Sequence, residues 1–138
     1  SGSEWNLYDF INEFSFTHHL PQGVFLLSQL KRLSGFWRTG QNELTNKFVR
    51  ITRIVEAFSD LHFVLLGDDS QKDPEIYLSI VSHFPEKILA VYIRAIHRPH
   101  SKRTQSIIAK IESKGVSCCY FKHSAEAINH SKKIGLIN

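Results

Sequence analysis

The stretch from residue 63 to residue 75 constrains the fold more than any other part of this sequence. An apolar run at 63–66 ends at Gly67, and a helix-start signature follows, with Pro74 at the first helical position and Glu75 in the first turn. Between the two lie three aspartates: Asp68, Asp69 and Asp73, the last at the expected N-cap. This order predicts a buried parallel strand that delivers carboxylates to its C-terminal end, where ligands bind in open α/β sheets.

Clustered carboxylate oxygens suit a hard cation such as Mg²⁺, so Asp68, Asp69 and Asp73 are candidate metal ligands. The alternative is that these acids only cap the helix and complement its dipole, and Asp73 is the residue that this alternative fits best. Three acids within residues 68–73 exceed what capping needs. The pattern therefore favours a Mg²⁺ site at the C-terminal edge of the sheet.

Length and composition predict one soluble domain. A chain of 138 residues, 42% of them hydrophobic, can bury its own core, so we expect a single α/β domain over 1–138. No apolar run reaches the length of a membrane helix, and the first residues lack the layout of a signal peptide. The adjacent Cys118 and Cys119 disfavour a disulfide and indicate a reducing compartment, which predicts a cytoplasmic protein.

Helix-like and strand-like segments alternate along the chain, and this alternation predicts a parallel α/β sheet. We expect a long loop over 28–43, where basic residues and glycines mix with two aromatic residues. The expected helices are 5–14, 45–58, 74–84, 101–114 with Gly115 as its C′ residue, and 126–134 capped by Ser124. The expected strands are 24–27, 63–66, 88–93 and 116–121.

The formal net charge is +4, and basic residues gather at 94–103 and in the last third of the chain. A basic surface can attract nucleic acid, anionic lipid or a phosphorylated substrate, and the charge alone does not choose among them. An ordinary solvated basic surface is the plain alternative. Arg94, at the end of an expected strand, is the best candidate for contact with an anion.

Several segments, taken in order, resemble the actin-patch-associated phosphatidate phosphatase catalytic domain, a branch of the haloacid dehalogenase superfamily. The resemblance covers roughly residues 1–98. The matching residues are Ser1, Ser3, Trp5–Tyr8, Leu20–Pro21, Gly23, Lys47, Gly67–Asp68, Gln71, Asp73–Tyr77, Phe84–Pro85 and Tyr92–Arg94. Any one of these segments would be weak evidence, whereas their shared order and spacing is specific.

The resemblance implies a three-layer, Rossmann-like parallel sheet and phosphoryl transfer through a phospho-aspartate with Mg²⁺ as cofactor. It gives Ser1 the role of a catalytic hydroxyl that holds a phosphate oxygen, with Ser3 as its nearest alternative. Lys47 would offset negative charge on the nucleophile and the phosphoryl oxygens. Asp68 would bind Mg²⁺, with Asp73 as a second acid of the same motif. The partners it implies are a phosphomonoester, phosphatidate among the candidates, and anionic lipid, but not nucleic acid.

The chain departs from the family pattern in two ways. Asp69-Ser70 stands where the family commonly has Ser-Gly, which adds a carboxylate and removes a flexible glycine. The second departure is larger, because no Asp-x-Asp-x-Thr motif, the source of the nucleophile and the general acid, occurs in the 138 residues. The chain thus looks like the C-terminal part of a catalytic domain, truncated on its N-terminal side.

Two functions follow from this comparison. The first is a Mg²⁺-dependent phosphatase whose attacking aspartate lies outside this chain, so that the 138 residues alone are inactive. The alternative is a non-catalytic module that has lost the nucleophile and binds phosphate groups or anionic lipid. In either case the missing central strand would expose a strand edge, so we expect either a changed strand order or self-association through that edge.

Overall fold

A computed structural model describes residues 7–21, 23–26, 39–96 and 101–138, with no account of the side chains of 39–45. The chain divides into two compact units, residues 1–47 and 48–138, and each is described by itself. The expectation of a single domain stays a prediction. The expected site residues Ser1 and Ser3 lie outside the described residues.

The first unit contains helix α1, Tyr8–Thr17, which lies further along the chain than the expected helix at 5–14. His19 follows it with a φ of 51°, a left-handed conformation that ends the helical run. The expected strand at 24–27 was wrong for the described residues 23–26, which form no strand. A strand needs a partner ladder, and Phe25 instead packs edge-on against Tyr8 of α1.

Helix α2, Thr39–Ala57, begins earlier than the expected start at 45. Residues 39–43 are therefore helical and not part of a loop, while 28–38 lie outside the described residues. The apolar stripe that predicts this helix begins only at Phe48, and the polar residues before it carry no hydrophobic period. Val55 on the stripe is buried, and the ring of Phe48 contacts that of His83.

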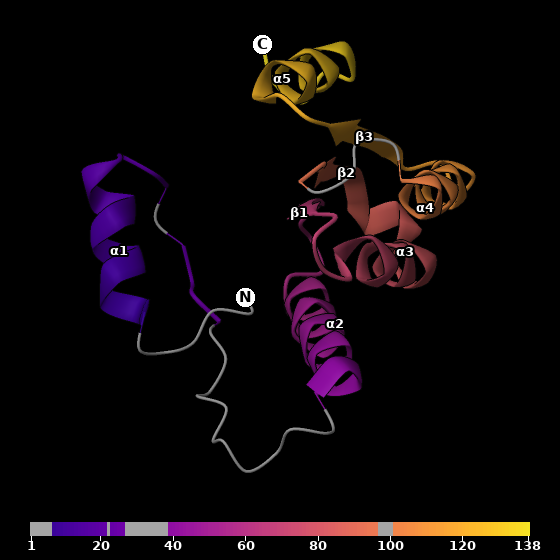
Figure 1. Cartoon of the computed structure of the whole chain (residues 1–138). Helices are drawn as coiled ribbons and strands as arrows, with labels where there is room; N and C mark the ends of the chain where they lie inside the picture. The colour runs from indigo at the N-terminus through magenta and orange to yellow at the C-terminus, as the bar shows by residue number, and fades with distance from the viewer. Residues whose placement is uncertain (1–6, 22, 27–38, 97–100) are drawn as a thin grey trace. The chain divides into compact units, whose positions relative to one another are not determined.

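The second unit is built around a parallel three-stranded sheet in the order β1-β2-β3 (Figure 1). The strands are β1, Phe63–Asp68; β2, Ile88–Arg94; and β3, Ser117–Phe121. The helices that follow them are α3, Asp73–His83; the short 3-10 helix η2, Pro85–Lys87; α4, Lys102–Glu112; and α5, Ser124–Lys133. A parallel sheet flanked by helices confirms the predicted α/β class, as a truncated Rossmann-like fold.

The helix ends differ from the expected caps at three positions. Lys72, and not Asp73, is the N-cap of α3, so Asp73 lies inside the first turn, where it is buried. At α5 the N-cap is His123, and its backbone N–H donates to Glu126 in a capping box. Helix α4 ends at Glu112 with Ser113 as its C-cap, so Gly115, with a φ of 82°, lies in the turn beyond the helix and is not the expected C′ residue.

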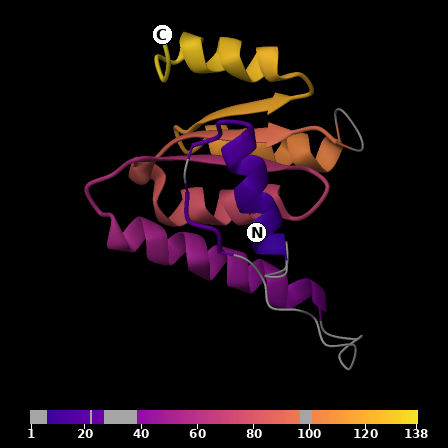
Figure 2. The ribbon, with the colours of Figure 1, turned by 90° about the vertical axis from the view of Figure 1, so that its left-hand side faces the viewer.

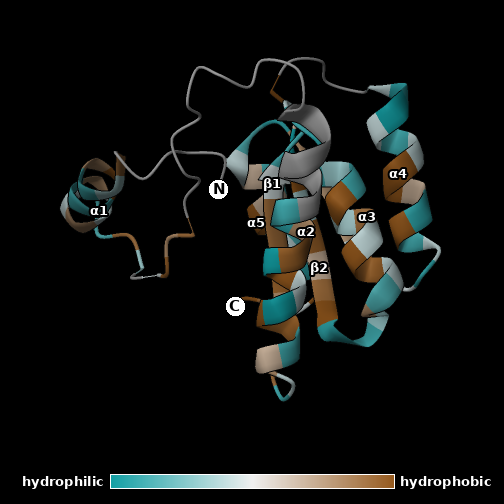
Figure 3. Ribbon diagram, turned by 90° about the horizontal axis from the view of Figure 1, so that it is seen from below, coloured by the Kyte–Doolittle hydropathy of each residue, from teal (hydrophilic) through white to brown (hydrophobic). Residues whose placement is uncertain are grey.

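Helices cover both faces of the sheet, and Figure 2 shows α5 on one side and α3 with α4 on the other. Leu65, Val91 and Cys118 are aligned in register and buried on the α3–α4 face. The next residue of each strand points to the opposite face, where the Tyr92 hydroxyl is hydrogen-bonded to Ser131 of α5 at 2.6 Å. Apolar residues run along α3, α4 and β2, coloured brown in Figure 3.

One edge of β1 has no strand partner within the described residues, where β1 pairs with β2 alone. On the α5 face beside this edge lies an apolar groove of about 310 Å³. Leu66 is 69% exposed there, and Val64 and Ile128 also line the groove. This is the edge at which the sequence predicts self-association, and that prediction stays open.

Candidate functional site

The carboxyl ends of all three strands meet at one edge of the sheet. Asp68, Arg94 and Phe121 are the last residues of β1, β2 and β3, and they are aligned in register. Asp69 and Asp73 follow β1 in the loop and in the first turn of α3. The structure therefore places four of the predicted site residues, Asp68, Asp69, Asp73 and Arg94, at this edge. Lys47 lies half-buried on α2 in the other unit.

Asp68 is held by its own loop. Its Oδ1 accepts the backbone N–H of Ser70 at 2.8 Å and also the Ser70 hydroxyl. An aspartate that bonds the backbone two residues further on forms a tight Asx turn, which starts the reversal from β1 towards α3. The carboxylate of Asp68 is thereby fixed directly at the strand end.

Asp73 lies against β1 at Gly67. A Cβ placed on Gly67 would lie 2.6 Å from the Tyr77 hydroxyl oxygen and closer still to Asp73 Oδ2, so only glycine fits between the strand and α3. The Tyr77 hydroxyl donates to the backbone carbonyl of Leu66. Burial raises the pKa of Tyr77, and the negative charges of Asp73 and Asp68 raise it further. The charges of both carboxylates thus raise the pKa of the same hydroxyl group.

Asp69 reaches across the sheet edge. Its Oδ1 accepts the backbone N–H of Ile96, after β2, at 2.8 Å, and its Oδ2 accepts the hydroxyl of Tyr120, on β3, at 2.6 Å. Burial raises the pKa of Tyr120 to about 12, with the hydrogen bond and the charge of Asp69 as the next causes. Asp69 therefore links three consecutive strand ends.

Two residues of this edge, Tyr77 and Tyr120, had no assigned role in the sequence-based prediction. Tyr77 could have been found, because it lies four residues after Asp73 and so shares its helix face. Tyr120 carries no comparable signal, since it is an aromatic residue near the end of an apolar strand. Only the three-dimensional structure brings it to Asp69.

Between the N-terminal ends of α3 and α4 lies a small polar cavity of about 110 Å³. Arg103 of α4 is paired there with Glu75 of α3 at 2.5 Å. Arg103 belongs to the basic segment 97–103, for which the sequence favours a solvated loop over contact with a phosphate, and of which 97–100 lie outside the described residues. The remaining lining residues are Asp69, Gln71, Pro74, Ser101 and Thr104.

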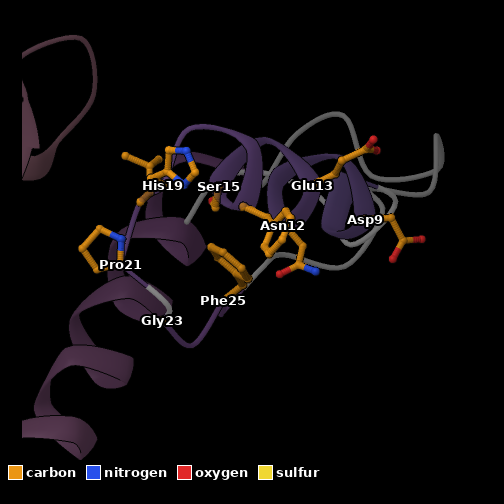
Figure 4. A pocket seen from close by; sticks show the side chains of 10 residues that line it. Asp9, Asn12, Glu13, Ser15, His19, Pro21, Gly23 and Phe25 are labelled. Atoms are coloured by element: carbon orange, nitrogen blue, oxygen red, sulfur yellow. The ribbon is translucent and has the colours of Figure 1, made fainter.

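The first unit has a separate, open hollow of about 820 Å³ between α1 and the segment that follows it (Figure 4). Asp9, Asn12 and Glu13 of α1 line one side, and Pro21 and Phe25 line the other. None of the predicted site residues within the described part of the chain lies in this hollow. We therefore keep the candidate site at the carboxyl edge of the sheet.

The carboxylates at the edge fit Mg²⁺ by the chemistry of their oxygen donors. Mg²⁺ is commonly held by one or two carboxylates together with waters and phosphate oxygens, and Asp68 and Asp73 supply two such groups. Within the described ranges no cluster of three or more His, Cys, Asp or Glu side chains could hold a metal ion.

Fold and site together define a Rossmann-like α/β domain with three acidic residues at the carboxyl edge of its sheet. Residues 1–95 match the family described as "Phosphatidate phosphatase APP1, catalytic domain", and the chain belongs to this family. The sequence is 30% identical to Phosphatidate phosphatase APP1 of Saccharomyces cerevisiae over 96 residues, and 26% identical to an uncharacterized protein of Schizosaccharomyces pombe over 97 residues.

These matches cover 68% and 70% of this chain, but only 16% of each relative, so the chain spans a small part of the length of both curated relatives. No solved structure matches the chain. Among the helices of the described residues, none is both long and apolar enough to cross a bilayer. Family membership therefore rests on sequence, and the structure adds the geometry of the edge.

Proposed function

We propose that the parent polypeptide is a Mg²⁺-dependent phosphatase that hydrolyses a phosphomonoester, phosphatidate being the first candidate. The observation that carries this proposal is the loop after β1, in which Asp68 and Asp73 supply carboxylates at the carboxyl edge of a parallel sheet within a family-matched segment. The family name and the superfamily resemblance support the same chemistry. We further propose that the domain is of the haloacid dehalogenase type and acts in the cytoplasm.

In the proposed reaction, an aspartate outside these 138 residues attacks the phosphoryl group, and water then hydrolyses the phospho-aspartate. Mg²⁺ held by Asp68 and Asp73 would neutralise charge that develops on the phosphoryl oxygens. Within this chain, Asp73 lies against Gly67 beside the Tyr77 hydroxyl, and Ser70 orients Asp68 through its hydrogen bonds. These contacts keep the two carboxylates in position before substrate arrives.

The remaining proposed roles belong to cationic and hydroxyl side chains. Lys47 would stabilise negative charge on the nucleophile and the substrate, and Arg94 would attract the phosphate group from the end of β2. Ser1, or Ser3 in its place, would hold a phosphate oxygen. Fixed positive charges and donors suit this reaction because phosphoryl transfer spreads negative charge over several oxygens. Anionic lipid would be the partner surface if phosphatidate is the substrate.

The test is the release of phosphate by the purified full-length parent with MgCl₂, from phosphatidate in mixed micelles and from water-soluble phosphomonoesters. We predict that Asp68→Asn lowers turnover by about a hundredfold or more, since it removes a charged ligand from the reacting centre. The thermal unfolding midpoint should change little, because Asp68 is bonded only within its own loop among the contacts described.

The matched control is Asp60→Asn, which makes the same chemical change at an exposed position just before β1. Its turnover should equal that of the wild type. If the wild-type parent released no phosphate from any of these substrates, the phosphatase proposal would fail. Binding of phosphatidate vesicles without turnover would then favour the non-catalytic module.

A further inference from the structure

Asp69 follows β1 directly and is hydrogen-bonded to residues at the carboxyl ends of both β2 and β3. Its backbone N–H donates to the carbonyl of Arg94 at 3.0 Å, which continues the β1–β2 ladder by one residue. Its side chain accepts from Ile96 and from Tyr120, as described above. Among the described hydrogen bonds, no other side chain bonds both the segment after β2 and a residue of β3.

The donors to Asp69 are well suited to hold a carboxylate. An amide N–H and a phenolic O–H each bond a separate oxygen, and hydrogen bonds to a charged acceptor are about twice as strong as neutral ones. Tyr120 is half-buried, which limits competition from water. The carboxylate is therefore directed towards the ends of β2 and β3, whereas Asp68 is bonded inside its own loop.

We propose that Asp69 is a positioning residue, whose carboxylate fastens the loop that follows Asp68 to the segment after β2 and to Tyr120 of β3, and that it does not ligate the metal. We call the contacts of Asp69 with Arg94, Ile96 and Tyr120 the Asp69 clasp. The clasp rests on these contacts alone, and only its consequence for Mg²⁺ rests on the proposed function.

The consequence concerns the segment after Ile96 as well as Asp68. Ile96 lies just after β2 and precedes the basic segment 97–103 in sequence, so the clasp fixes the chain at Ile96. Ala95 is anchored separately, because its N–H donates to the carbonyl of Phe121 at 2.7 Å. Loss of the clasp should therefore free Ile96 and leave Ala95 bonded.

Amide hydrogen exchange of the 138-residue chain, followed by NMR, tests the clasp without any activity. In Asp69→Ala the Ile96 amide should exchange about ten- to a hundredfold faster, as expected for the loss of a hydrogen bond to a charged acceptor. The Ala95 amide is the internal reference and should change little. Unchanged exchange at Ile96 would overturn the proposal.

Tyr120→Phe is the milder variant, because it removes one hydroxyl and keeps the ring. It should speed exchange at Ile96 about two- to tenfold, through loss of one support of Asp69. The double variant should exchange no faster at Ile96 than Asp69→Ala alone, because both changes break the same contact. Additive effects of the two substitutions would contradict a shared clasp.

A titration of the full-length parent with MgCl₂ distinguishes a positioning role of Asp69 from a role as a metal ligand. If Asp69 positions the loop, Asp69→Ala and Tyr120→Phe should both raise the Mg²⁺ concentration for half-maximal phosphate release while turnover at saturating Mg²⁺ persists. If Asp69→Ala is as inactive as Asp68→Asn at every Mg²⁺ concentration and Tyr120→Phe is unaffected, Asp69 is a ligand and the proposal is wrong. If wild type releases no phosphate, only the proposed function fails, and the exchange experiment still decides the clasp.

Discussion

Gly67 is the residue at which the sheet and α3 approach each other most closely. We predict that Gly67→Ala destabilises the fold by about 1–3 kcal/mol, because the added methyl group collides with Asp73 and with the Tyr77 hydroxyl. Urea unfolding followed by circular dichroism measures the loss. Gly23→Ala is the control, since nothing lies near its Cβ position, and an equal effect of both substitutions would contradict the steric argument.

We predict that the buried thiol of Cys118 makes the free energy of unfolding fall at alkaline pH. Burial raises the pKa of its thiol from an ordinary value of about 9 to about 12, with the charge of Glu112 as the next cause. A group whose pKa is raised in the folded state holds its proton there after the unfolded chain has lost it. Stability is therefore complete below pH 9 and falls as the pH rises towards 12, by at most about 1.4 kcal/mol per pH unit for this thiol.

The measurement is the free energy of unfolding in urea at pH 8 and at pH 10.5, at one ionic strength. Cys118→Val removes the thiol at similar volume, and its stability should fall less steeply with pH than that of the wild type. The raised pKa values of Tyr77 and Tyr120 act in the same direction and remain in the variant. Identical slopes for both proteins would show that Cys118 does not titrate as described.

At the level of elements, β1 is a strand with one unpaired edge in the described part of the chain. We predict that Leu66→Lys weakens self-association of the 138-residue chain by about tenfold or more, because a charge on an exposed edge opposes pairing with a second copy. Sedimentation equilibrium over a range of concentrations measures the dissociation constant.

Leu89→Lys is the matched control, since Leu89 is also exposed but lies on the central strand β2. It should leave the dissociation constant unchanged. A wild-type chain that stays monomeric throughout the range would refute self-association through β1.

Most elements of the second unit could be predicted because their hydrophobic periods are strong and their turn residues are unambiguous. The apolar runs at 63–66 and 88–93 correspond to β1 and β2, whereas α4 ends at Glu112, before the expected end marked by Gly115. The start of α2 could not be predicted, because residues 39–43 are polar and give no period. The expected strand at 24–27 failed because apolar composition does not supply a pairing partner.

At the level of the whole molecule, the candidate site was partly predictable. Parallel strands place their carboxyl ends together, so a run of aspartates after β1 locates the edge from sequence alone. The contacts made by Asp69 were not predictable, because Ile96 and Tyr120 are distant in sequence and neither belongs to a recognisable pattern. Sequence therefore predicted that the three acids lie at one edge of the sheet, whereas the structure distinguished the surroundings of each acid.

The proposed mechanism predicts that the 138-residue chain has no phosphatase activity of its own, because the attacking aspartate would come from outside it. Phosphate release from phosphatidate with MgCl₂ should not exceed that of an Asp68→Asn chain at equal concentration. Circular dichroism confirms that both chains are folded during the assay. Turnover by the wild-type chain that depends on Mg²⁺ would refute the proposed source of the nucleophile.

The strand order β1-β2-β3 also bears on how the chain folds during synthesis. Each of these strands pairs with the one that precedes or follows it in sequence, so no pairing among them waits for a remote segment. The β1–β2 ladder can form as soon as β2 has left the ribosome, and β3 then adds to an existing edge. Helix α5 follows β3 in sequence, and its Ser131 docks on this sheet through a hydrogen bond to the Tyr92 hydroxyl of β2.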